Sequence, residues 1–248
     1  MRGVILAGGS GSRLYPLTRI TNKHLLPVYD RPMVYFAVEA LVGAGIDRIL
    51  VVTGGNHAGE FLPLLGNGSA FGLRHLDYTF QEHASGIADA LGLARHFADG
   101  DSVCLMLADN VFEWSLRPSV LRFLAQGGGA RLLLSQVDHP QHYGVPALQD
   151  GRIVRIDEKP AQPPSQYAVT GCYFYDSNVF SIVETLVPSH RGELEITDVN
   201  NGYIARGGLQ HEILEGYWAD CGESFDSYTR ATNLVAKRGA NKARPEWL

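Results

Sequence analysis

The 248-residue sequence predicts an α/β protein with one mostly parallel, mixed sheet that helices flank on both faces. Two observations predict this class. Short apolar or β-branched runs alternate with helical patterns through the first half of the chain, which is typical of βαβ units on a parallel sheet. From Gly144 onward, strand-like runs follow one another with turn residues between them, which indicates hairpins and a mixed sheet. A chain of this length can bury a sizeable core, so we expect a single domain over residues 1–248.

The elements expected in the first half alternate between strand and helix. Strands are predicted at Val4–Leu6, Ile49–Val52, Arg74–Phe80, Val103–Leu107 and Leu132–Val137. Helices are predicted at Met33–Ala44, Ile87–Phe97 and Pro118–Gln126. Apolar residues recur at helical spacing in the first of these helices, and a proline in the first turn suits the start of the third.

The second half is expected to begin with strands and to end with helices. The strands are predicted at Gly144–Leu148, Ile153–Lys159 and Val169–Tyr175, and the turn signal Gln149-Asp150-Gly151 separates the first two. Helices are predicted at Val179–Leu186, Ile196–Ala205 and Phe225–Arg238. Residues 239–248 are expected to form a frayed tail.

The composition disfavours several classes of protein. Hydrophobic residues make up 45% and charged residues 19% of the chain, which is the balance of a folded protein and not of a disordered one. The 21 basic and 26 acidic residues leave a net charge of −5, which disfavours general binding to nucleic acids or to anionic membranes. No apolar run approaches the roughly 18 residues that a membrane span needs.

The cysteines and the N-terminus indicate where the protein works. Cys104, Cys172 and Cys221 lie far apart without a CxxC pair, which disfavours a disulfide framework and a zinc site. The N-terminal apolar run enters a glycine-rich turn at once, so it predicts a buried strand and not a signal peptide. We therefore expect a cytosolic protein.

A glycine-rich turn after the first predicted strand is the first candidate site. Its sequence is Leu6-Ala7-Gly8-Gly9-Ser10-Gly11-Ser12-Arg13-Leu14. At the carboxyl end of a parallel strand, such a turn lets backbone N–H groups approach an anion. A dinucleotide fingerprint fits poorly because Leu14 occupies the third glycine position, and a P-loop lacks its final Gly-Lys-Ser/Thr. A triphosphate cradle completed by Arg13 and a plain turn before a buried helix both stay open.

The segments after this turn resemble the signature of the sugar-1-phosphate nucleotidylyltransferases. The signature covers Gly8–Thr18, Lys23–Val28 and Asp30–Met33, with Ser12 where the family usually has threonine. The resemblance continues over essentially the whole chain, at Gln81–Ala88, Leu107–Asn110, Tyr143–Val145, Glu158–Pro160, Tyr167–Gly171, Glu193–Asp198 and Trp218–Gly222. In the metal-binding segment, Ala108 stands where the family usually has glycine.

The resemblance implies a fold, a reaction and a cofactor. The fold would be the Rossmann-like nucleotide-diphospho-sugar transferase fold, with residues 1–137 binding mainly the nucleotide and residues 138–238 mainly the sugar phosphate. The reaction would be Mg²⁺-dependent attack of a hexose 1-phosphate on the α-phosphorus of a nucleoside triphosphate. We expect dTTP and glucose 1-phosphate as substrates. UTP or another sugar 1-phosphate remains an alternative, because one methyl group is worth only about 1–3 kcal/mol of discrimination.

The same motifs assign candidate residues to each part of this reaction. The catalytic residues would be Arg13, Lys23, Asp109, Lys159 and Asp220, with Asp109 and Asp220 holding Mg²⁺. The nucleotide-binding residues would be Leu6, Ala7, Gly8, Gly9, Gly11, Ser12, Arg13, Gln81, Gly86 and Asp109. The sugar-phosphate-binding residues would be Asn110, Gly144, Glu158, Lys159, Val169, Gly171 and Trp218. Cations and metal-binding carboxylates suit this chemistry because two anions must meet and be aligned.

Each of these residues is weak evidence when taken alone. An aspartate after a strand commonly caps a helix or forms a turn, and a lysine or arginine in a loop is commonly solvated. A catalytically silent subunit that binds nucleotide sugars is the competing hypothesis from another functional class. The presence of all five charged candidates favours an active enzyme.

Other polar residues are expected to have supporting roles. The Gln81 amide offers both a donor and an acceptor to a pyrimidine edge. His139 and His142 are expected in a lid over the sugar and not in a metal site. Glu195 is expected to cap the helix that follows it, and Glu193 is a candidate pocket residue.

The last expectation concerns regulation and assembly. Long forms of the family continue beyond the position of Leu248 and carry a second nucleotide site after the Asp-Asn motif. In this chain the corresponding stretch is Val111–Pro118, where the charge of Glu113 would disfavour an anion. We therefore expect product inhibition only by competition at the active site, and a homo-oligomer, with a homodimer favoured.

Overall fold

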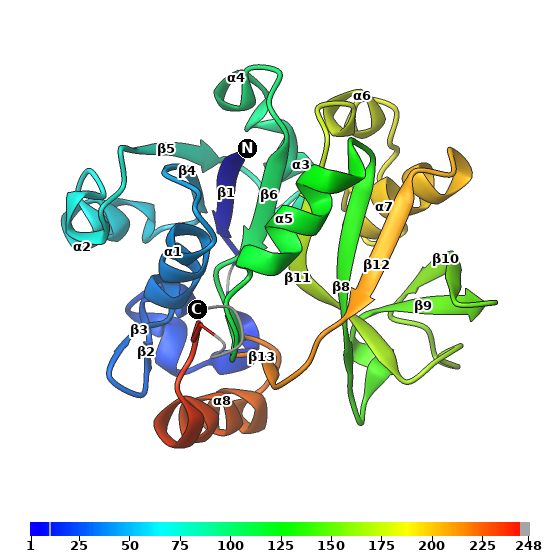
Figure 1. Ribbon diagram of the computed structural model, residues 1–248. Coiled ribbons are helices and arrows are strands. Elements are labelled where there is room, and N and C mark those ends of the chain that lie inside the picture. Colours follow the sequence, from blue (N-terminus) through cyan, green and yellow to red (C-terminus); the bar gives the residue numbers. More distant parts are fainter. Residues whose placement is uncertain (10, 244–248) are drawn as a thin grey trace.

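The computed structural model describes residues 1–9 and 11–243 and is built on a seven-stranded sheet (Figure 1). The strand order is β12-β8-β11-β6-β1-β4-β5. These strands are β1 (Arg2–Ala7), β4 (Arg48–Gly54), β5 (His75–Gln81), β6 (Val103–Leu107), β8 (Ala130–Gln136), β11 (Tyr167–Tyr175) and β12 (Leu209–Ile213). Strand β11 is antiparallel to both β6 and β8, whereas the other pairs in the sheet are parallel. The predicted mostly parallel, mixed sheet is confirmed.

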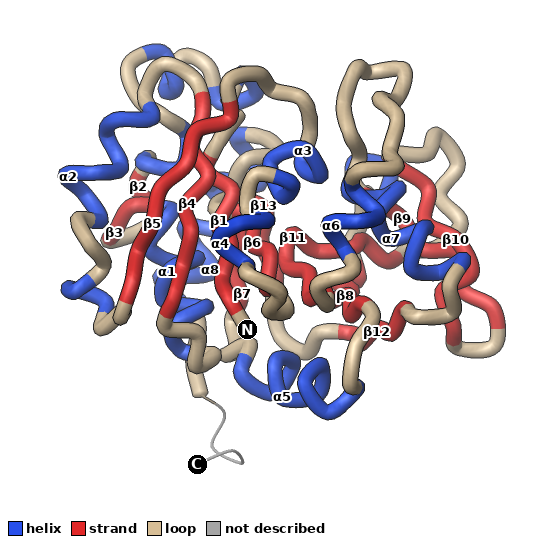
Figure 2. The backbone as a smooth tube through the Cα atoms, turned by 90° about the horizontal axis from the view of Figure 1, so that it is seen from above, coloured by secondary structure: helices blue, strands red, loops and turns tan. Residues whose placement is uncertain are grey.

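Helices cover both faces of this sheet, as Figure 2 shows from above. One face is packed by α1 (Met33–Gly43), α2 (Phe61–Leu65) and α5 (Arg117–Gln126). The other face is packed by α3 (Ile87–Gly92), α4 (Arg95–Ala98), α6 (Val179–Val183) and α7 (Ile196–Ala205). Along β1, Ile5 faces the first layer while Val4 and Leu6 face the second. Successive side chains of a strand point to opposite faces, so a strand buried on both sides must be apolar throughout.

Three two-stranded sheets lie outside the central one. They are β2 (Pro27–Val28) with β3 (Arg31–Pro32), β7 (Asn110–Phe112) with β13 (Trp218–Asp220), and β9 (Gly144–Gln149) with β10 (Arg152–Glu158). The last pair is the hairpin that the turn at Asp150-Gly151 predicts. The β7–β13 pair joins segments about half the chain apart.

A third apolar core lies under the last helix, α8 (Phe225–Arg238). Ala231 and Val235 of α8 pack with Val111 of β7 and Ala219 of β13. Ser224 caps α8 by accepting a hydrogen bond from the Ser227 backbone, and Ser227 returns the bond, so the helix starts where the sequence predicts. Helix α8 thus supports the β7–β13 pair.

The C-terminal segment is partly different from the expectation of a frayed tail. The Asn241 backbone N–H donates to the Phe112 carbonyl at 2.8 Å, and its side chain donates to the Phe36 carbonyl at 2.9 Å. The Lys242 N–H donates to the Glu113 carbonyl at 2.9 Å. Residues 239–243 are therefore docked on the strand β7 segment and on α1. The rest of the predicted tail, 244–248, lies outside the described residues.

Two other differences have local causes. The single helix predicted over Ile87–Phe97 is split into α3 and α4, and the break follows Gly92, a residue that weakens a helix interior by up to about 1 kcal/mol. Strand β12 is not predicted, because it is short, polar and at the sheet edge. In the described part of the chain, we find no helix with the length and apolar character needed to cross a bilayer.

Candidate active site

Four parallel strands end at one edge of the central sheet, and the candidate residues follow them. In the register of this sheet, Leu6 of β1 pairs with Leu107 of β6, and Gly54 of β4 pairs with Gln81 of β5. Gly8 therefore leaves the same edge as Gln81 and Asp109. This is the edge at which ligands gather in α/β proteins.

The β7–β13 pair brings the two predicted metal-binding carboxylates together. Asp220 lies opposite Asn110 in this antiparallel ladder, and Asn110 directly follows Asp109 in the chain. The Cys221 N–H donates to the Asp109 carbonyl at 2.8 Å, and the Gly222 N–H donates to Asp220 Oδ1 at 2.9 Å. The backbone thus holds both side chains at one place.

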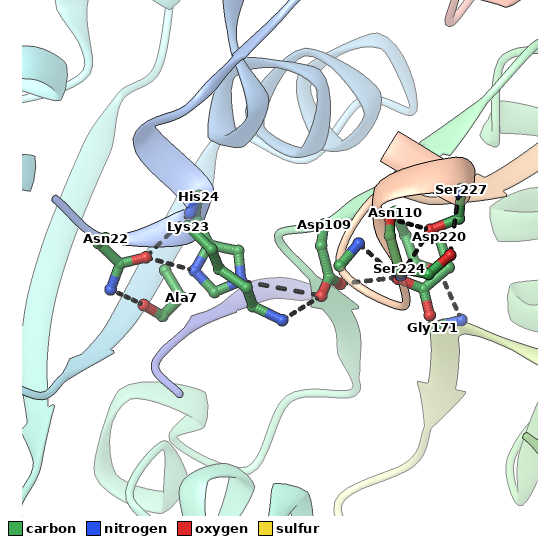
Figure 3. Close-up of polar contacts among 11 residues, drawn as sticks. Ala7, Asn22, Lys23, His24, Asp109, Asn110, Gly171, Asp220, Ser224 and Ser227 are labelled. Atoms are coloured by element: carbon green, nitrogen blue, oxygen red, sulfur yellow. Dashed lines mark hydrogen bonds and ion pairs between the residues drawn. The ribbon is translucent and has the colours of Figure 1, made fainter. Parts of the chain in front are cut away.

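Lys23 reaches these carboxylates from the loop after β1. Its Nζ lies 2.5 Å from Asp109 Oδ2, and Figure 3 shows it approaching Asp109 from the side opposite Asn110. Burial favours the neutral amine, but the charges of Asp109 and Asp220 raise the pKa of Lys23 above its ordinary value. Lys23 is therefore a largely buried cation that is paired with Asp109 and is also stabilised by the charge of Asp220.

The two carboxylates have opposite pKa shifts. Burial opposes ionisation of Asp109, but the Lys23 charge lowers the pKa of Asp109 well below its usual range. Burial and the nearby Asp109 charge raise the pKa of Asp220 to about 7. Two like charges at one site ionise with difficulty, so an additional cation would favour the doubly ionised pair.

A buried histidine supports the turn that carries Lys23. The His24 ring Nδ1 is 2.8 Å from Asn22 Oδ1, and Asn22 Nδ2 donates to the Ala7 carbonyl at 3.2 Å. Burial and the Lys23 charge lower the pKa of His24 to about 3, so the ring is neutral at physiological pH. Sequence reasoning did not single out Asn22 and His24, although both stand beside the predicted Lys23.

Asn110 connects Asp109 to the neighbouring strands. Its Nδ2 donates to Asp109 Oδ1 at 2.9 Å, and its Oδ1 accepts from Gly171 N–H at 2.8 Å and from Trp218 Nε1 at 2.6 Å. A Cβ at Gly171 would lie 2.7 Å from the Asn110 side chain, so glycine is required there. These bonds orient Asp109. The sugar contact predicted for Asn110 stays a prediction.

One cavity of about 240 Å³ gathers all of the predicted sugar-phosphate residues. The predicted residues in its wall are Arg13, Asp109, Asn110, Gly144, Glu158, Lys159, Val169, Gly171, Trp218 and Asp220. Its wall also contains Arg191, which sequence reasoning missed. Its Nη2 lies 3.5 Å from Glu158 Oε1 and 3.3 Å from Glu193 Oε2. In the sequence, Arg191 stands just before Glu193 and Glu195, and a lone arginine beside two acids is the signal that could have identified it.

A second cavity of about 220 Å³ holds residues predicted for the nucleotide. The predicted residues in its wall are Leu6, Gly8, Gly9, Lys23, Gln81, Gly86 and Asp109. Asp109 and Glu193 line both cavities, so the two spaces meet at the carboxylate site. The structure does not place Ala7, Gly11 and Ser12 in either wall; the Gly11 carbonyl instead accepts from Thr18 Oγ1 at 2.9 Å.

The cap predicted for Glu195 is wrong. Glu195 stands at the N-terminus of α7, but its carboxylate does not cap the helix. Arg191 Nη2 donates to Glu195 Oε2 at 2.7 Å, and Ser189 Oγ donates to Oε1 at 2.7 Å. A guanidinium four residues earlier competes successfully with backbone N–H groups, because two charge-assisted bonds are stronger than one cap.

The expected effect of Glu113 also needs correction. Its side chain is 3% exposed and is paired with Arg238 Nη2 at 2.6 Å and Lys242 Nζ at 3.2 Å. The two cations neutralise its charge, so Glu113 does not repel an anion in the manner expected. Among the described residues, there is no cluster of three or more potential metal ligands, and the rings of His139 and His142 stack 5.9 Å apart.

Comparisons with known proteins find relatives that match almost the whole chain. The sequence profile of the nucleotidyl transferase family matches residues 2–238. The chain is 45% identical over 239 residues to the glucose-1-phosphate thymidylyltransferase of Neisseria meningitidis serogroup A / serotype 4A, covering 95% of this chain and 82% of that protein. It is 44% identical over 254 residues to the enzyme of the same name from Mycolicibacterium smegmatis, covering 99% and 87%.

Solved structures support the same relationship. A Bacillus anthracis protein assigned as a glucose-1-phosphate thymidylyltransferase, crystallised with sucrose, superposes with a TM-score of 0.92 at 48% identity, covering 98% of each chain. An apo UDP-glucose pyrophosphorylase superposes with a TM-score of 0.81 at 22% identity, covering 96% of this chain and 98% of that one. The second likeness concerns the fold alone.

Proposed function

This chain belongs to the nucleotidyl transferase family, and from that premise we propose that it transfers a thymidylyl group from dTTP to glucose 1-phosphate. The products are dTDP-glucose and pyrophosphate. An oxygen of the sugar 1-phosphate attacks the α-phosphorus, and the bond from that phosphorus to the bridging oxygen of pyrophosphate breaks. The observation that carries the proposal is the meeting of two cavities at Asp109, one with a glycine-rich wall and one with several cations.

The donor set at Asp109 and Asp220 fits a magnesium ion. Carboxylate oxygens are the ligands that Mg²⁺ prefers, and this ion commonly takes only one or two protein carboxylates together with waters and phosphate oxygens. Burial and the Asp109 charge raise the pKa of Asp220 although Lys23 lies nearby, so a further cation would favour its ionised form. When bound, the ion supplies charge that stabilises phosphate oxygens.

The cations of the chain align two anions that repel each other. Arg13 and Lys23 bind the triphosphate and stabilise charge on the α-phosphate and on the departing pyrophosphate. Lys159, with Arg191 beside it in the same cavity, binds the phosphate of the sugar. Because a sugar phosphate is already ionised at neutral pH, this reaction needs no general base.

The sugar lies against neutral and acidic groups in the first cavity. Glu158 Oε2 accepts from Thr197 Oγ1 at 2.6 Å, and Oε1, which lies 3.5 Å from Arg191 Nη2, accepts from sugar hydroxyls in this proposal. The Trp218 ring is fixed by its Nε1 bond to Asn110 and forms an apolar wall. Gly144 and Gly171 lie in the wall of the same cavity, where their backbones contact the sugar in this proposal.

The proposal treats residues 1–137 as the main nucleotide half and residues 138–238 as the main sugar half. Each cavity nevertheless takes residues from both halves, since Arg13 lines the sugar cavity and Glu193 lines the nucleotide cavity. We further propose a cytosolic homodimer. Light scattering after size exclusion measures the mass of the assembly and would exclude the dimer if it gave a monomer or a tetramer.

One assay tests the proposed activity. Pyrophosphate release is measured with dTTP, UTP, dCTP and dATP, each combined with glucose, galactose and mannose 1-phosphates, with and without Mg²⁺. The proposal expects the largest kcat/KM for dTTP with glucose 1-phosphate, and none without a divalent ion. A preference for UTP would identify the uridylyltransferase alternative. Binding without turnover in every pair would identify a silent binding subunit.

A further inference from the structure

The side-chain amide of Gln81 is held by two acceptor oxygens, one from Asp89 outside the nucleotide cavity and one from Gly86 in its wall. Gln81 ends β5, and its Nε2 donates to Asp89 Oδ2 at 2.7 Å and to the Gly86 carbonyl at 3.1 Å. A carbonyl and an ionised carboxylate can only accept hydrogen bonds. A flipped amide would set Oε1 against both oxygens, so the network places the nitrogen on this side.

The amide oxygen of Gln81 is thereby turned toward the cavity. Both N–H groups of Nε2 are used, and among the described residues none donates to Oε1. Oε1 lies 3.6 Å from the position of a Cβ built on Gly8, which lines the cavity wall. Gln81 therefore offers the cavity an acceptor and no donor, although the residue type could offer either.

The rest of this cavity suits a flat, apolar ring. Its wall includes the side chains of Leu6, Val52, Ala90 and Leu107. Asp89 itself is not part of the wall, so its carboxylate acts on a bound base only through Gln81. By fixing the orientation of the Gln81 amide, Asp89 decides whether the cavity presents a hydrogen-bond acceptor or a donor to the base.

We propose that Asp89 is a positioning residue for base selection, which locks Gln81 Oε1 toward the nucleotide and selects pyrimidines that carry a proton on N3. This inference rests on the proposed function and deepens it. Thymine and uracil donate from N3, whereas N3 of cytosine bears a lone pair that meets Oε1 unfavourably. Asp89 therefore separates 4-keto from 4-amino pyrimidines and does not separate thymine from uracil.

The test is the Asp89→Asn variant, which keeps the shape of the side chain. An asparagine amide can turn either its oxygen or its nitrogen toward Gln81, so Gln81 loses its charged acceptor and only the Gly86 carbonyl still opposes a flip. We expect the ratio of kcat/KM for dTTP to that for dCTP to fall by at least about tenfold, and likewise UTP to CTP. The KM for glucose 1-phosphate and the kcat with dTTP stay within a few-fold of the wild type.

A matched control separates this effect from a general loss of structure. Asp77→Asn changes a carboxylate on the same strand as Gln81, where it pairs with His75 at 3.4 Å, and leaves the dTTP-to-dCTP ratio unchanged. If Asp89→Asn fails to fold, Asp89→Ala is measured instead, and the same fall is expected because the stronger acceptor is lost. An unchanged ratio in a folded Asp89 variant of an active enzyme overturns the inference.

Binding measurements keep this result separate from the proposed activity. If the wild type turns over no pyrimidine triphosphate, the proposed function fails. Calorimetric titration of dTTP and of dCTP into the wild type and the Asp89 variant then decides the inference alone. A wild type that binds dTTP more tightly than dCTP, and a variant that has lost this preference, supports it. Equal preference in both proteins refutes it.

Discussion

Replacing Glu113 by glutamine should destabilise the folded protein by about 2 kcal/mol at neutral pH. Glu113 follows β7, and its Oε2 accepts from the Tyr217 N–H at 3.0 Å while Arg238 and Lys242 neutralise it. It thus connects β7, the start of β13, the end of α8 and the segment after it. These are the elements that hold Asp109 and Asp220.

The magnitude follows from burial and from the exposure of the partners. Removing one partner of a buried ion pair commonly costs about 3–5 kcal/mol. Here Arg238 is 48% exposed and Lys242 is 37% exposed, so both cations regain water when the carboxylate is lost. Glutamine also keeps an oxygen for the Tyr217 N–H. Hydrogen bonds to charged groups are worth about 1.5–3 kcal/mol, and we take the lower part of that range.

The effect should depend on pH with a defined sign. Although burial opposes ionisation, the Tyr217 N–H and the two cations lower the pKa of Glu113 below its ordinary value of 4.5. A group with a lowered folded-state pKa stabilises the fold above its unfolded pKa, and this stabilisation is lost as the pH falls through the folded value. The difference between wild type and Glu113→Gln should be constant from pH 8 to pH 5 and should shrink below about pH 4.5.

Urea denaturation followed by circular dichroism measures the difference at each pH. Glu184→Gln is the matched control, because Glu184 is 64% exposed and pairs with Arg95, which is 42% exposed. We expect the control to change the free energy of unfolding by less than about 0.5 kcal/mol. Equal midpoints for wild type and Glu113→Gln at pH 7 would refute the reasoning, as would a difference that persists undiminished at pH 3.

Three further predictions concern the proposed active site. Asp109→Asn or Asp220→Asn should abolish pyrophosphate release under saturating Mg²⁺ while circular dichroism stays unchanged, since each variant removes charge but keeps shape. Lys159→Ala should raise the KM for glucose 1-phosphate far more than that for dTTP, whereas Arg13→Ala should act chiefly on dTTP and on kcat; steady-state kinetics with the reverse pattern would contradict this division. In Gly222→Ala the new Cβ would lie 2.5 Å from Asp109 Oδ2 and would displace this carboxylate, so kcat should fall by on the order of a hundredfold. Retention of full kcat would show that the reaction tolerates a displaced Asp109 carboxylate.

Regular elements with a strong pattern were predictable from the sequence. The observed bounds of β6, α7 and α8 are those predicted, at Val103–Leu107, Ile196–Ala205 and Phe225–Arg238. Each has an apolar run or an amphipathic period that a turn or cap ends. Strand β12 and the α3–α4 break were not predictable in this way, since an edge strand buries little and a helix break depends on what the helix packs against.

The chemical types in the candidate site were also predictable, because its motifs lie in short segments of the sequence. Glycines, cations and carboxylates at these spacings led to the residues that line the two cavities. The motifs did not reveal which partner each polar side chain bonds to. Glu195 bonds to Arg191 and not to a helix end, and the charge of Glu113 is neutralised by residues more than a hundred positions away.

The sequence by itself determined the sheet class, most helices of the two layers and the residue types of the site, whereas α2 was not predicted. These follow from local periodicity and from the chemistry of single side chains. The resemblance already assigned Asp109 and Asp220 to one metal site, but only the tertiary structure decided that Lys23 contacts Asp109 and that Gln81 turns its Oε1 toward the cavity. The physical reason is that a hydrogen bond or a pKa depends on the partners within a few ångströms, and the folding of the chain decides which atoms come that close, as with Lys23 and Asp109.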